Sequence, residues 1–288
     1  MSAPAQQVFR FAPSPNGLLH LGHALSALLN FRLARAAQGR FLLRIEDIDP
    51  VRSRPEFVRA IEDDLTWLGL VWEKPVRHQS HHMADYARAL DALALRGLLY
   101  PCFCTRGDLA RAVAGRPGWP HDPDGAPLYP GTCRDMPQAA RALLHAIGAP
   151  FAQRLDLAKA LAALPLDMGW RETCADGSAR SERANPALWG DAILARKDVP
   201  ASYHLCVVVD DALQGVSDVV RGADLAASTH LHRLLQAVLS LPVPRYHHHS
   251  LIIDEAGAKL AKSRLSQPLR QWRAQGATPD DIARQVGL

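Results

Sequence analysis

The chain has 288 residues and a mass of 31.5 kDa, which suits one elaborated domain or two interleaved ones. Hydrophobic residues make up 48% and charged residues 22%, and no apolar run approaches the roughly 18 residues of a membrane-spanning helix, so this composition excludes a disordered chain and a membrane protein. The 33 basic and 29 acidic side chains give a net charge of +4, which is too small to imply a polyanionic partner. The first seven residues lack the basic cluster and apolar stretch of a secretory signal, so we expect a cytoplasmic protein.

The first 70 residues alternate between strand and helix patterns. Apolar runs predict strands at residues 8–12 and 41–45, and apolar periodicity predicts helices at 21–37 and 54–68. The turn-rich segment Pro13-Ser14-Pro15-Asn16-Gly17 joins the first strand to the first helix. This order predicts a parallel sheet with right-handed crossovers, and in such sheets ligands bind beyond the carboxyl ends of the strands.

The pattern changes near residue 101. Residues 115–127 are too rich in Gly and Pro for regular structure, so we expect a loop there. Beyond it, strands are predicted at 205–209, 216–220 and 246–253, and helices at 228–239, 267–275 and 279–286. We therefore expect a nucleotide-binding fold in two halves, with an insertion between them and short helices after them: residues 1–100, 101–190, 191–265 and 266–288.

A histidine pair marks the start of the first predicted helix, in the segment His20-Leu21-Gly22-His23. Imidazoles at i and i+3 share a helix face, and a helix N-terminus is a natural place for phosphate. Gly22 has no side chain, so a flat base could pack against its backbone. By itself the tetrapeptide fits a packing or solvated role better, but its place after a strand and a turn favours nucleotide binding.

A lysine pair lies far downstream, in the segment Lys259-Leu260-Ala261-Lys262-Ser263. Two lysines and a hydroxyl in a loop suit a triphosphate whose charge grows during displacement. The alternative is a solvated surface loop, which is the usual explanation of an isolated lysine pair.

The five cysteines are an odd number and fit a disulfide framework poorly. Cys102, Cys104 and Cys133 cluster, and in a reducing compartment such a cluster indicates metal binding. Zn²⁺ prefers four tetrahedral ligands, so one place stays open. Water or one of three side chains could fill it: Tyr129, His121 or Cys174. Three thiols without a metal are the alternative.

The histidine and lysine segments together resemble the HIGH and KMSKS signatures of the class I aminoacyl-tRNA synthetases. Three further segments resemble the glutamyl branch of that family. Residues 10–17 are similar to its R-F-A-P-S-P-T-G, residues 44–49 to its R-I-E-D-T-D, and residues 207–211 with 219–222 to its V-V-V-D-D…V-I-R-G. The five matches follow one order from Arg10 to Ser263 and cover the whole catalytic region.

Two departures narrow the resemblance. Full-length glutamyl-tRNA synthetases continue much further after the KMSKS loop, so the resemblance implies that their anticodon-binding region is missing here. The pattern Cys-x-Cys…Tyr-x-x-x-Cys resembles the zinc site of the glutamyl-Q tRNA(Asp) synthetases, short paralogues that attach glutamate to queuosine in the anticodon of tRNA(Asp). That likeness favours Tyr129 as the fourth ligand of a structural zinc. It leaves two alternatives, which are a truncated glutamyl-tRNA synthetase that charges an acceptor end and a non-catalytic paralogue that binds tRNA or amino acid.

The resemblance implies an α/β fold, in which a Rossmann-type parallel sheet carries an inserted zinc-containing α+β subdomain and a short C-terminal helical segment. It also implies that ATP, with Mg²⁺, activates glutamate to an adenylate, which is then transferred to tRNA(Asp), and that the protein is a monomer. The expected catalytic residues are His20, His23, Lys259 and Lys262, and the expected ATP-binding residues are His20, Gly22, His23 and Lys262. The expected glutamate-binding residues are Arg10, Ala12, Ser14, Glu46, Tyr203 and Arg221. Ala261 stands where the KMSKS signature has serine, which removes one hydroxyl.

Overall fold

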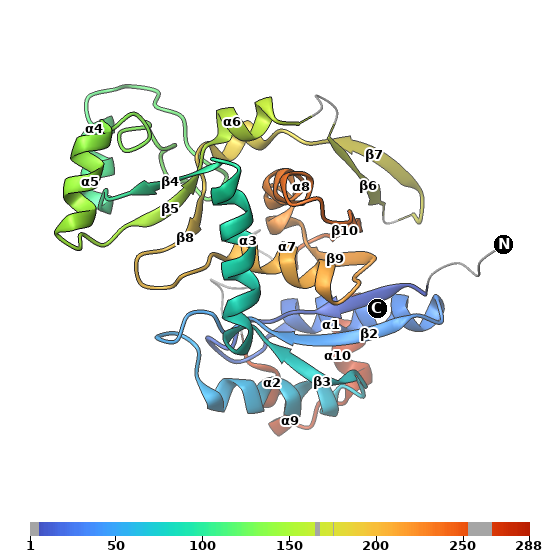
Figure 1. The fold of residues 1–288 in the computed structure, drawn as a ribbon. Coiled ribbons are helices and arrows are strands. Elements are labelled where there is room, and N and C mark those ends of the chain that lie inside the picture. Colours follow the sequence, from blue (N-terminus) through green and yellow to red (C-terminus); the bar gives the residue numbers. More distant parts are fainter. Residues whose placement is uncertain (1–5, 165–167, 175, 253–266) are drawn as a thin grey trace.

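A seven-stranded sheet forms the centre of the computed structural model, which describes residues 6–164, 168–174, 176–252 and 267–288 (Figure 1). The strand order is β3-β2-β1-β9-β10-β6-β7, and all neighbours are parallel except β6 and β7. The strands are β1 (Val8–Phe11), β2 (Arg40–Ile45), β3 (Glu73–His78), β6 (Gly169–Thr173), β7 (Ala179–Arg183), β9 (Asp218–Gly222) and β10 (Arg245–His249).

Strand β1 lies at the point where the order of the sheet reverses. It pairs with β2 on one side, from Val8 opposite Arg40 to Phe11 opposite Leu43, and with the distant β9 on the other. In open parallel sheets the crevice at such a point, beyond the carboxyl ends of the strands, is where ligands bind. The fold thus places the end of β1 and the end of β9 beside the same crevice.

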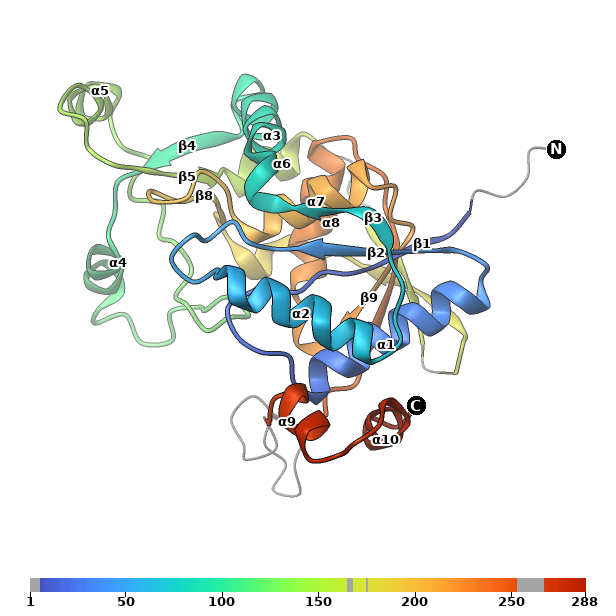
Figure 2. The ribbon, with the colours of Figure 1, turned by 90° about the horizontal axis from the view of Figure 1, so that it is seen from below.

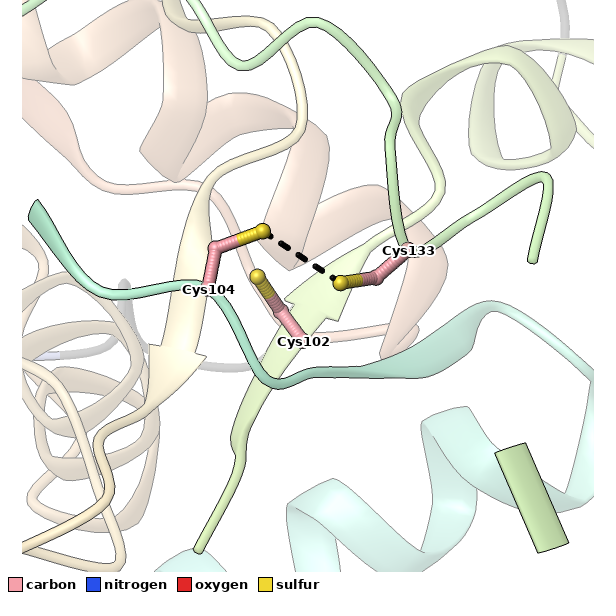
Figure 3. A group of neighbouring side chains, drawn as sticks. All are labelled: Cys102, Cys104 and Cys133. Atoms are coloured by element: carbon pink, nitrogen blue, oxygen red, sulfur yellow. Dashed lines mark hydrogen bonds between the residues drawn. The ribbon is translucent and has the colours of Figure 1, made fainter. Parts of the chain in front are cut away.

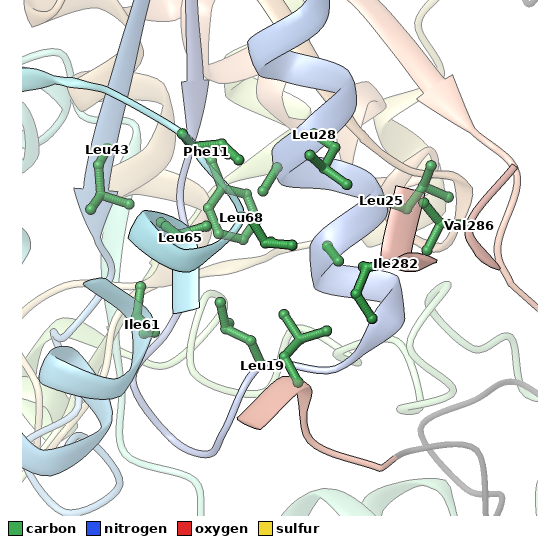
Figure 4. Close-up of a cluster of buried hydrophobic side chains, with 14 of the residues drawn as sticks. Phe11, Leu19, Leu25, Leu28, Leu43, Ile61, Leu65, Leu68, Ile282 and Val286 are labelled. Atoms are coloured by element: carbon green, nitrogen blue, oxygen red, sulfur yellow. The ribbon is translucent and has the colours of Figure 1, made fainter. Parts of the chain in front are cut away.

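Helices cover both faces of this sheet (Figures 1 and 2). One face carries α1 (Leu21–Ala36), α2 (Pro55–Trp67), α9 (Leu269–Ala274) and α10 (Pro279–Gln285), and the other carries α3 (Met83–Leu95), α7 (Tyr203–Leu213) and α8 (Ser228–Val238). Figure 4 shows Ile282 and Val286 packed beside Leu25 of α1 in one core, so the last helices belong to the hydrophobic core of the first strands. None of the helices in the described part of the chain combines the length and apolarity needed to cross a bilayer.

A second, three-stranded sheet lies at one end of the molecule (Figure 1). Its antiparallel strands are β4 (Leu99–Cys102), β5 (Ala152–Leu155) and β8 (Ile193–Ala195), accompanied by α4 (Arg106–Val113), α5 (Gln138–Ala146) and α6 (Leu157–Ala162). Strands β6 and β7 come from the segment expected as an insertion but extend the large sheet, whereas β8 follows that segment and completes the small sheet. The 3₁₀ helices η1 (Gln79–His82), η2 (Pro186–Trp189) and η3 (Ala223–Leu225) serve as connections.

Most predicted elements are confirmed to within three residues, but the strand predicted at 205–209 is wrong. Those residues belong to α7, whose N-cap Ser202 accepts a hydrogen bond from the Leu205 amide. Residues 205–211 are all buried, and a helix buried on every side has the continuous apolar run that also marks a buried strand. The strand expected at 216–220 begins only at Asp218, and the one expected at 246–253 ends at His249, with residue 253 outside the described residues. Residues 115–127 contain no helix or extended strand.

Candidate active site

A cavity of about 430 Å³ opens at the carboxyl ends of β1 and β9. All the described residues that the sequence suggested for ATP or glutamate line it: Arg10, Ala12, Ser14, His20, Gly22, His23, Glu46, Tyr203 and Arg221. Lys259 and Lys262 lie outside the described residues. Ile252, just before that segment, lines the cavity, and Pro268, just after it, forms a β-bridge with His20.

The two histidines cap helix α1 reciprocally. Nδ1 of His20 accepts a hydrogen bond from the Gly22 amide at 3.1 Å, and Nδ1 of His23 accepts one from the His20 amide at 3.2 Å. Burial lowers the pKa of His20, and burial together with the neighbouring His20 lowers that of His23 to about 3. Both rings are therefore neutral at pH 7, and each carries its proton on Nε2, where it can be donated to a ligand.

Gly22 has a steric reason to lack a side chain. A Cβ atom there would lie 3.0 Å from Cε1 and 3.2 Å from Nδ1 of His20. A side chain would therefore press on the imidazole that accepts the hydrogen bond of residue 22. This is a reason for the glycine in addition to the stacking surface that the sequence suggests.

Arg221, at the end of β9, offers a buried positive charge to the cavity. The residue is 6% exposed, and its guanidinium donates to His248 Nε2 at 3.2 Å, His232 Nδ1 at 3.4 Å and Thr229 Oγ1 at 2.8 Å. Burial and the nearby Arg221 hold the pKa of His232 well below its usual value, so all three acceptors are neutral. Among the described residues no carboxylate forms an ion pair with Arg221. The cavity thus has an uncompensated cation in its wall, which a ligand carboxylate would neutralise.

Arg10 and Glu46 belong to a buried ion-pair cluster below the same cavity. Asp211 accepts from Arg10 Nε at 3.1 Å and from Arg44 Nη1 at 2.7 Å, and Arg44 also donates to Glu46 at 3.1 Å. Although burial raises the pKa of Asp211, the two guanidinium groups outweigh it and leave the pKa below its usual value. Glu46 lines the cavity, where its carboxylate can face a ligand ammonium.

The adjacent Asp210 extends this cluster to a third strand. It accepts hydrogen bonds from Arg77 of β3 at 2.7 Å, Gln79 at 2.8 Å and Tyr86 at 2.9 Å. In the sequence, this aspartate pair was noted only as part of a segment that resembles the family, and no role was expected for it. Two adjacent acids within a buried apolar helix must be paired, because unpaired carboxylates are almost never fully buried. That signal was available in the sequence, although the partners were not.

The three cysteines of the predicted metal site converge beside the small sheet (Figure 3). Their sulfur atoms all lie within 4.8 Å of one another, and Cys104 Sγ lies 3.5 Å from Cys133 Sγ. Four ligands placed tetrahedrally around zinc at ~2.3 Å would lie ~3.8 Å apart, so the thiol arrangement fits that ion. Cys102 and Cys133 are buried, as a structural site requires.

The hydroxyl of Tyr129 lies beside the three thiols of this cluster. It lies 3.4 Å from Cys104 Sγ and accepts a hydrogen bond from the Cys133 amide at 2.8 Å. The guanidinium of Arg154 stacks over the ring, 3.9 Å from its centroid. Within the described residues, neither His121 nor Cys174 joins the group. Among the described side chains, three thiols and one phenol therefore meet at this cluster.

Residues 7–288 match the catalytic domain of the tRNA synthetases class I (E and Q). The chain belongs to this family. The match takes in the four described segments named above, which line one cavity or lie beneath it. It also confirms the expected fold, a mostly parallel α/β sheet of the class I synthetase type.

Curated relatives in the family cover nearly the whole chain. A glutamyl-Q tRNA(Asp) synthetase of Rhodobacter capsulatus is 47% identical over 98% of this chain and 100% of that relative. A glutamyl-Q tRNA(Asp) synthetase of Symbiobacterium thermophilum is 40% identical over 95% of this chain and 83% of that relative.

Among solved structures, a glutamate tRNA ligase of Elizabethkingia meningosepticum in complex with its amino acid has a TM-score of 0.71 at 25% identity. It covers 94% of this chain, and this chain spans only 53% of that ligase. A methionyl-tRNA synthetase of Mycobacterium tuberculosis has a TM-score of 0.55 at 14% identity, which supports the fold alone.

Proposed function

We propose that this chain activates glutamate with ATP and transfers it to queuosine in the anticodon of tRNA(Asp). The observation that carries the amino-acid part is Arg221, a buried cation in the cavity wall whose described protein partners are all neutral. An acidic side chain neutralises that charge, and the names of the relatives support glutamate rather than aspartate. The names of the relatives support the acceptor.

Activation begins when the α-carboxylate of glutamate attacks the α-phosphorus of ATP. The bond to the bridging oxygen breaks, pyrophosphate leaves, and glutamyl-adenylate remains. His20 and His23 donate from Nε2 to phosphate oxygens as charge develops there. Lys262 neutralises the leaving pyrophosphate with help from Lys259, and Mg²⁺ arrives bound to ATP. The neutral state of both histidines supports their role as hydrogen-bond donors.

Glutamate is held at both of its charged ends. Arg221 binds the side-chain carboxylate, with Arg10 as the second cation of the pocket, and Glu46 faces the ammonium group. Ala12, Ser14 and Tyr203 form the remaining wall. In the second step a hydroxyl of the modified base attacks the adenylate carbonyl and releases AMP.

Cys102, Cys104, Cys133 and Tyr129 hold a structural zinc ion in this proposal. The ion would tie the end of β4 to the loop that carries Tyr129 and Cys133, far from the reacting atoms. Elemental analysis of protein purified without chelators should find zinc, and its absence would refute this part of the proposal. In this proposal the enzyme acts in the cytoplasm as a monomer. Light scattering of the purified chain tests the monomeric state.

Transfer to oxidised tRNA tests the acceptor. tRNA(Asp) annealed from two halves, of which only the half without queuosine has had its 3′ terminus oxidised by periodate, should accept labelled glutamate, and nuclease digestion should recover the label in the anticodon fragment. tRNA(Asp) without queuosine is the matched control and should stay unlabelled. If the label appears at the 3′ adenosine and oxidation blocks it, the chain is a truncated glutamyl-tRNA synthetase. If no glutamate-dependent pyrophosphate exchange occurs, it is a binding protein.

A further inference from the structure

Counting the N–H groups of Arg221 that already have an acceptor shows which of them remain for a ligand. A guanidinium has five N–H bonds, one on Nε and two on each terminal nitrogen. Nε donates to His248, and the terminal nitrogens donate once each to His232 and Thr229. Within the described residues, one N–H therefore remains on each terminal nitrogen. Two terminal N–H groups can bind one carboxylate bidentately.

This arrangement holds only while His248 accepts at Nε2. Arg221 Nε lies 3.2 Å from that nitrogen and can only donate a hydrogen bond to it. Thr229 Oγ1 also lies 3.2 Å from the same nitrogen. The imidazole must therefore carry its proton on Nδ1. If the proton moved to Nε2, two N–H groups would point at each other and the guanidinium would turn away.

Glu172 of β6 fixes the required tautomer. Its carboxylate lies 2.9 Å from His248 Nδ1 and 2.9 Å from the His248 amide, and it accepts from Trp170 Nε1 at 2.9 Å. An ionised carboxylate can only accept, so Nδ1 must donate. Burial alone would raise the pKa of Glu172, but hydrogen bonds from His248 and Trp170 outweigh it and bring the pKa to about 2. The carboxylate is thus ionised throughout the physiological range.

We propose that Glu172 and His248 are positioning residues that set the direction in which Arg221 donates, and thereby the preference of the pocket for a carboxylate over an amide side chain. The inference deepens the proposed glutamate activation and rests on it. Neither residue lines the cavity, so both act through Arg221. The neighbouring His247 and His249 bind elsewhere, to the Thr173 carbonyl and to Ser26.

The test measures pyrophosphate exchange with glutamate or glutamine in four variants. His248→Leu removes the acceptor, whereas His248→Gln places a carbonyl oxygen near the position of Nε2. Glu172→Gln brings an amide that can donate to Nδ1 and so invert the tautomer. Glu182→Gln, the same change at a partly exposed β7 residue paired with Arg180, is the control.

We expect His248→Leu and Glu172→Gln each to raise the KM for glutamate about tenfold and to lower the preference for glutamate over glutamine by about the same factor, because a hydrogen bond to a charged group is lost. The KM for ATP should not change. His248→Gln should recover most of the preference, and Glu182→Gln should match the parent.

Three results would overturn the inference. In the first, His248→Leu and Glu172→Gln keep the parental KM and preference. In the second, the KM for ATP rises in step with that for glutamate. In the third, His248→Gln is as impaired as His248→Leu, which indicates a merely structural residue.

If His248→Leu does not fold, as judged by circular dichroism, the contrast between His248→Gln and Glu172→Gln decides. A parent without glutamate-dependent exchange would overturn the proposed function itself, whereas a glutamate-specific parent with insensitive variants would overturn only this inference.

Discussion

Arg221 is the residue on which amino-acid choice depends most directly. Arg221→Ala should leave the glutamate side-chain carboxylate unpaired in a buried pocket, at a cost of roughly 2 to 5 kcal/mol of binding. The KM for glutamate in pyrophosphate exchange should rise while that for ATP stays the same. Arg221→Lys keeps the charge but loses the bidentate fork, so it should fall between parent and alanine. Glutamate dependence unchanged in Arg221→Ala would remove this residue from the pocket.

Individual residues of the site differ in how far the sequence could predict them. The spacing of His20 and His23, and the likeness of the segment around Arg221 to the family, were enough to suggest these residues for the site. A helix start and a strand end are local features that a sequence can reveal. The partners of Arg221 were not predictable. Thr229 and His232 come from α8 and His248 from β10, which lies beside β9 only through the strand order of the sheet. The same order places β6 beside β10, so that Glu172 reaches His248.

Helix α7 shows why one element was assigned wrongly. Its three consecutive valines have high β-propensity, and an apolar run of this length fits a buried strand as well as a buried helix. The segment forms a helix because packing against neighbouring helices outweighs its local β-propensity: α7 contacts both α3 and α8. The last turn of α7 carries the two aspartates beneath the cavity.

Helix α2 carries an unsatisfied acid that should make stability depend on pH. Asp64 is 3% exposed, and its Oδ2 atom has no hydrogen-bond partner. Burial, and then the adjacent Asp63, raise its pKa to about 6, against the opposing effect of Arg270 and Arg273 of α9. An Asp whose pKa is raised on folding stabilises the folded state below its unfolded pKa of ~3.9, and this contribution is lost as the pH rises through about 6.

Asp64→Asn removes that charge and should stabilise the protein at pH 7.5 by about 1 to 2 kcal/mol, because the buried carboxylate no longer has to ionise. The gain should shrink as the pH falls towards 4.5. Urea unfolding of both chains at the two pH values measures it. A difference that does not vary with pH would show that Asp64 titrates in the same way in the folded and unfolded states.

The whole molecule has two sheets that should respond differently to metal loss. Cys104→Ser removes one of the converging thiols, so bound zinc should fall and amide hydrogen exchange should rise in β4 and in residues 129–133. The seven-stranded sheet has its own cores and should keep its protection. Cys206→Ser, at a buried cysteine of α7 outside the cluster, is the control for thiol loss. Equal loosening of both sheets would contradict an independently stabilised small sheet.

For the whole molecule, the sequence predicted most strands of the large sheet, but it did not predict which strands belong to the large sheet and which to the small one. Strands β6 and β7 are short and mostly polar, and nothing in the segments 169–173 and 179–183 indicates which sheet they join. Their place depends on Glu172 and Trp170 packing against β10, which is a long-range contact.

The aspartate pair of α7 has a consequence for how the protein is made. Arg10, Arg44 and Arg77 sit on three successive N-terminal strands, yet Asp210 and Asp211 follow 133 to 201 residues later in the chain. At a synthesis rate of ~5–20 residues per second, the first strand leaves the ribosome well before its counter-charges exist. Nascent chains arrested before residue 210 should therefore be cut by protease within the first three strands, where the released chain resists. Equal resistance would mean that the strands fold first and that the carboxylates arrive at a finished sheet.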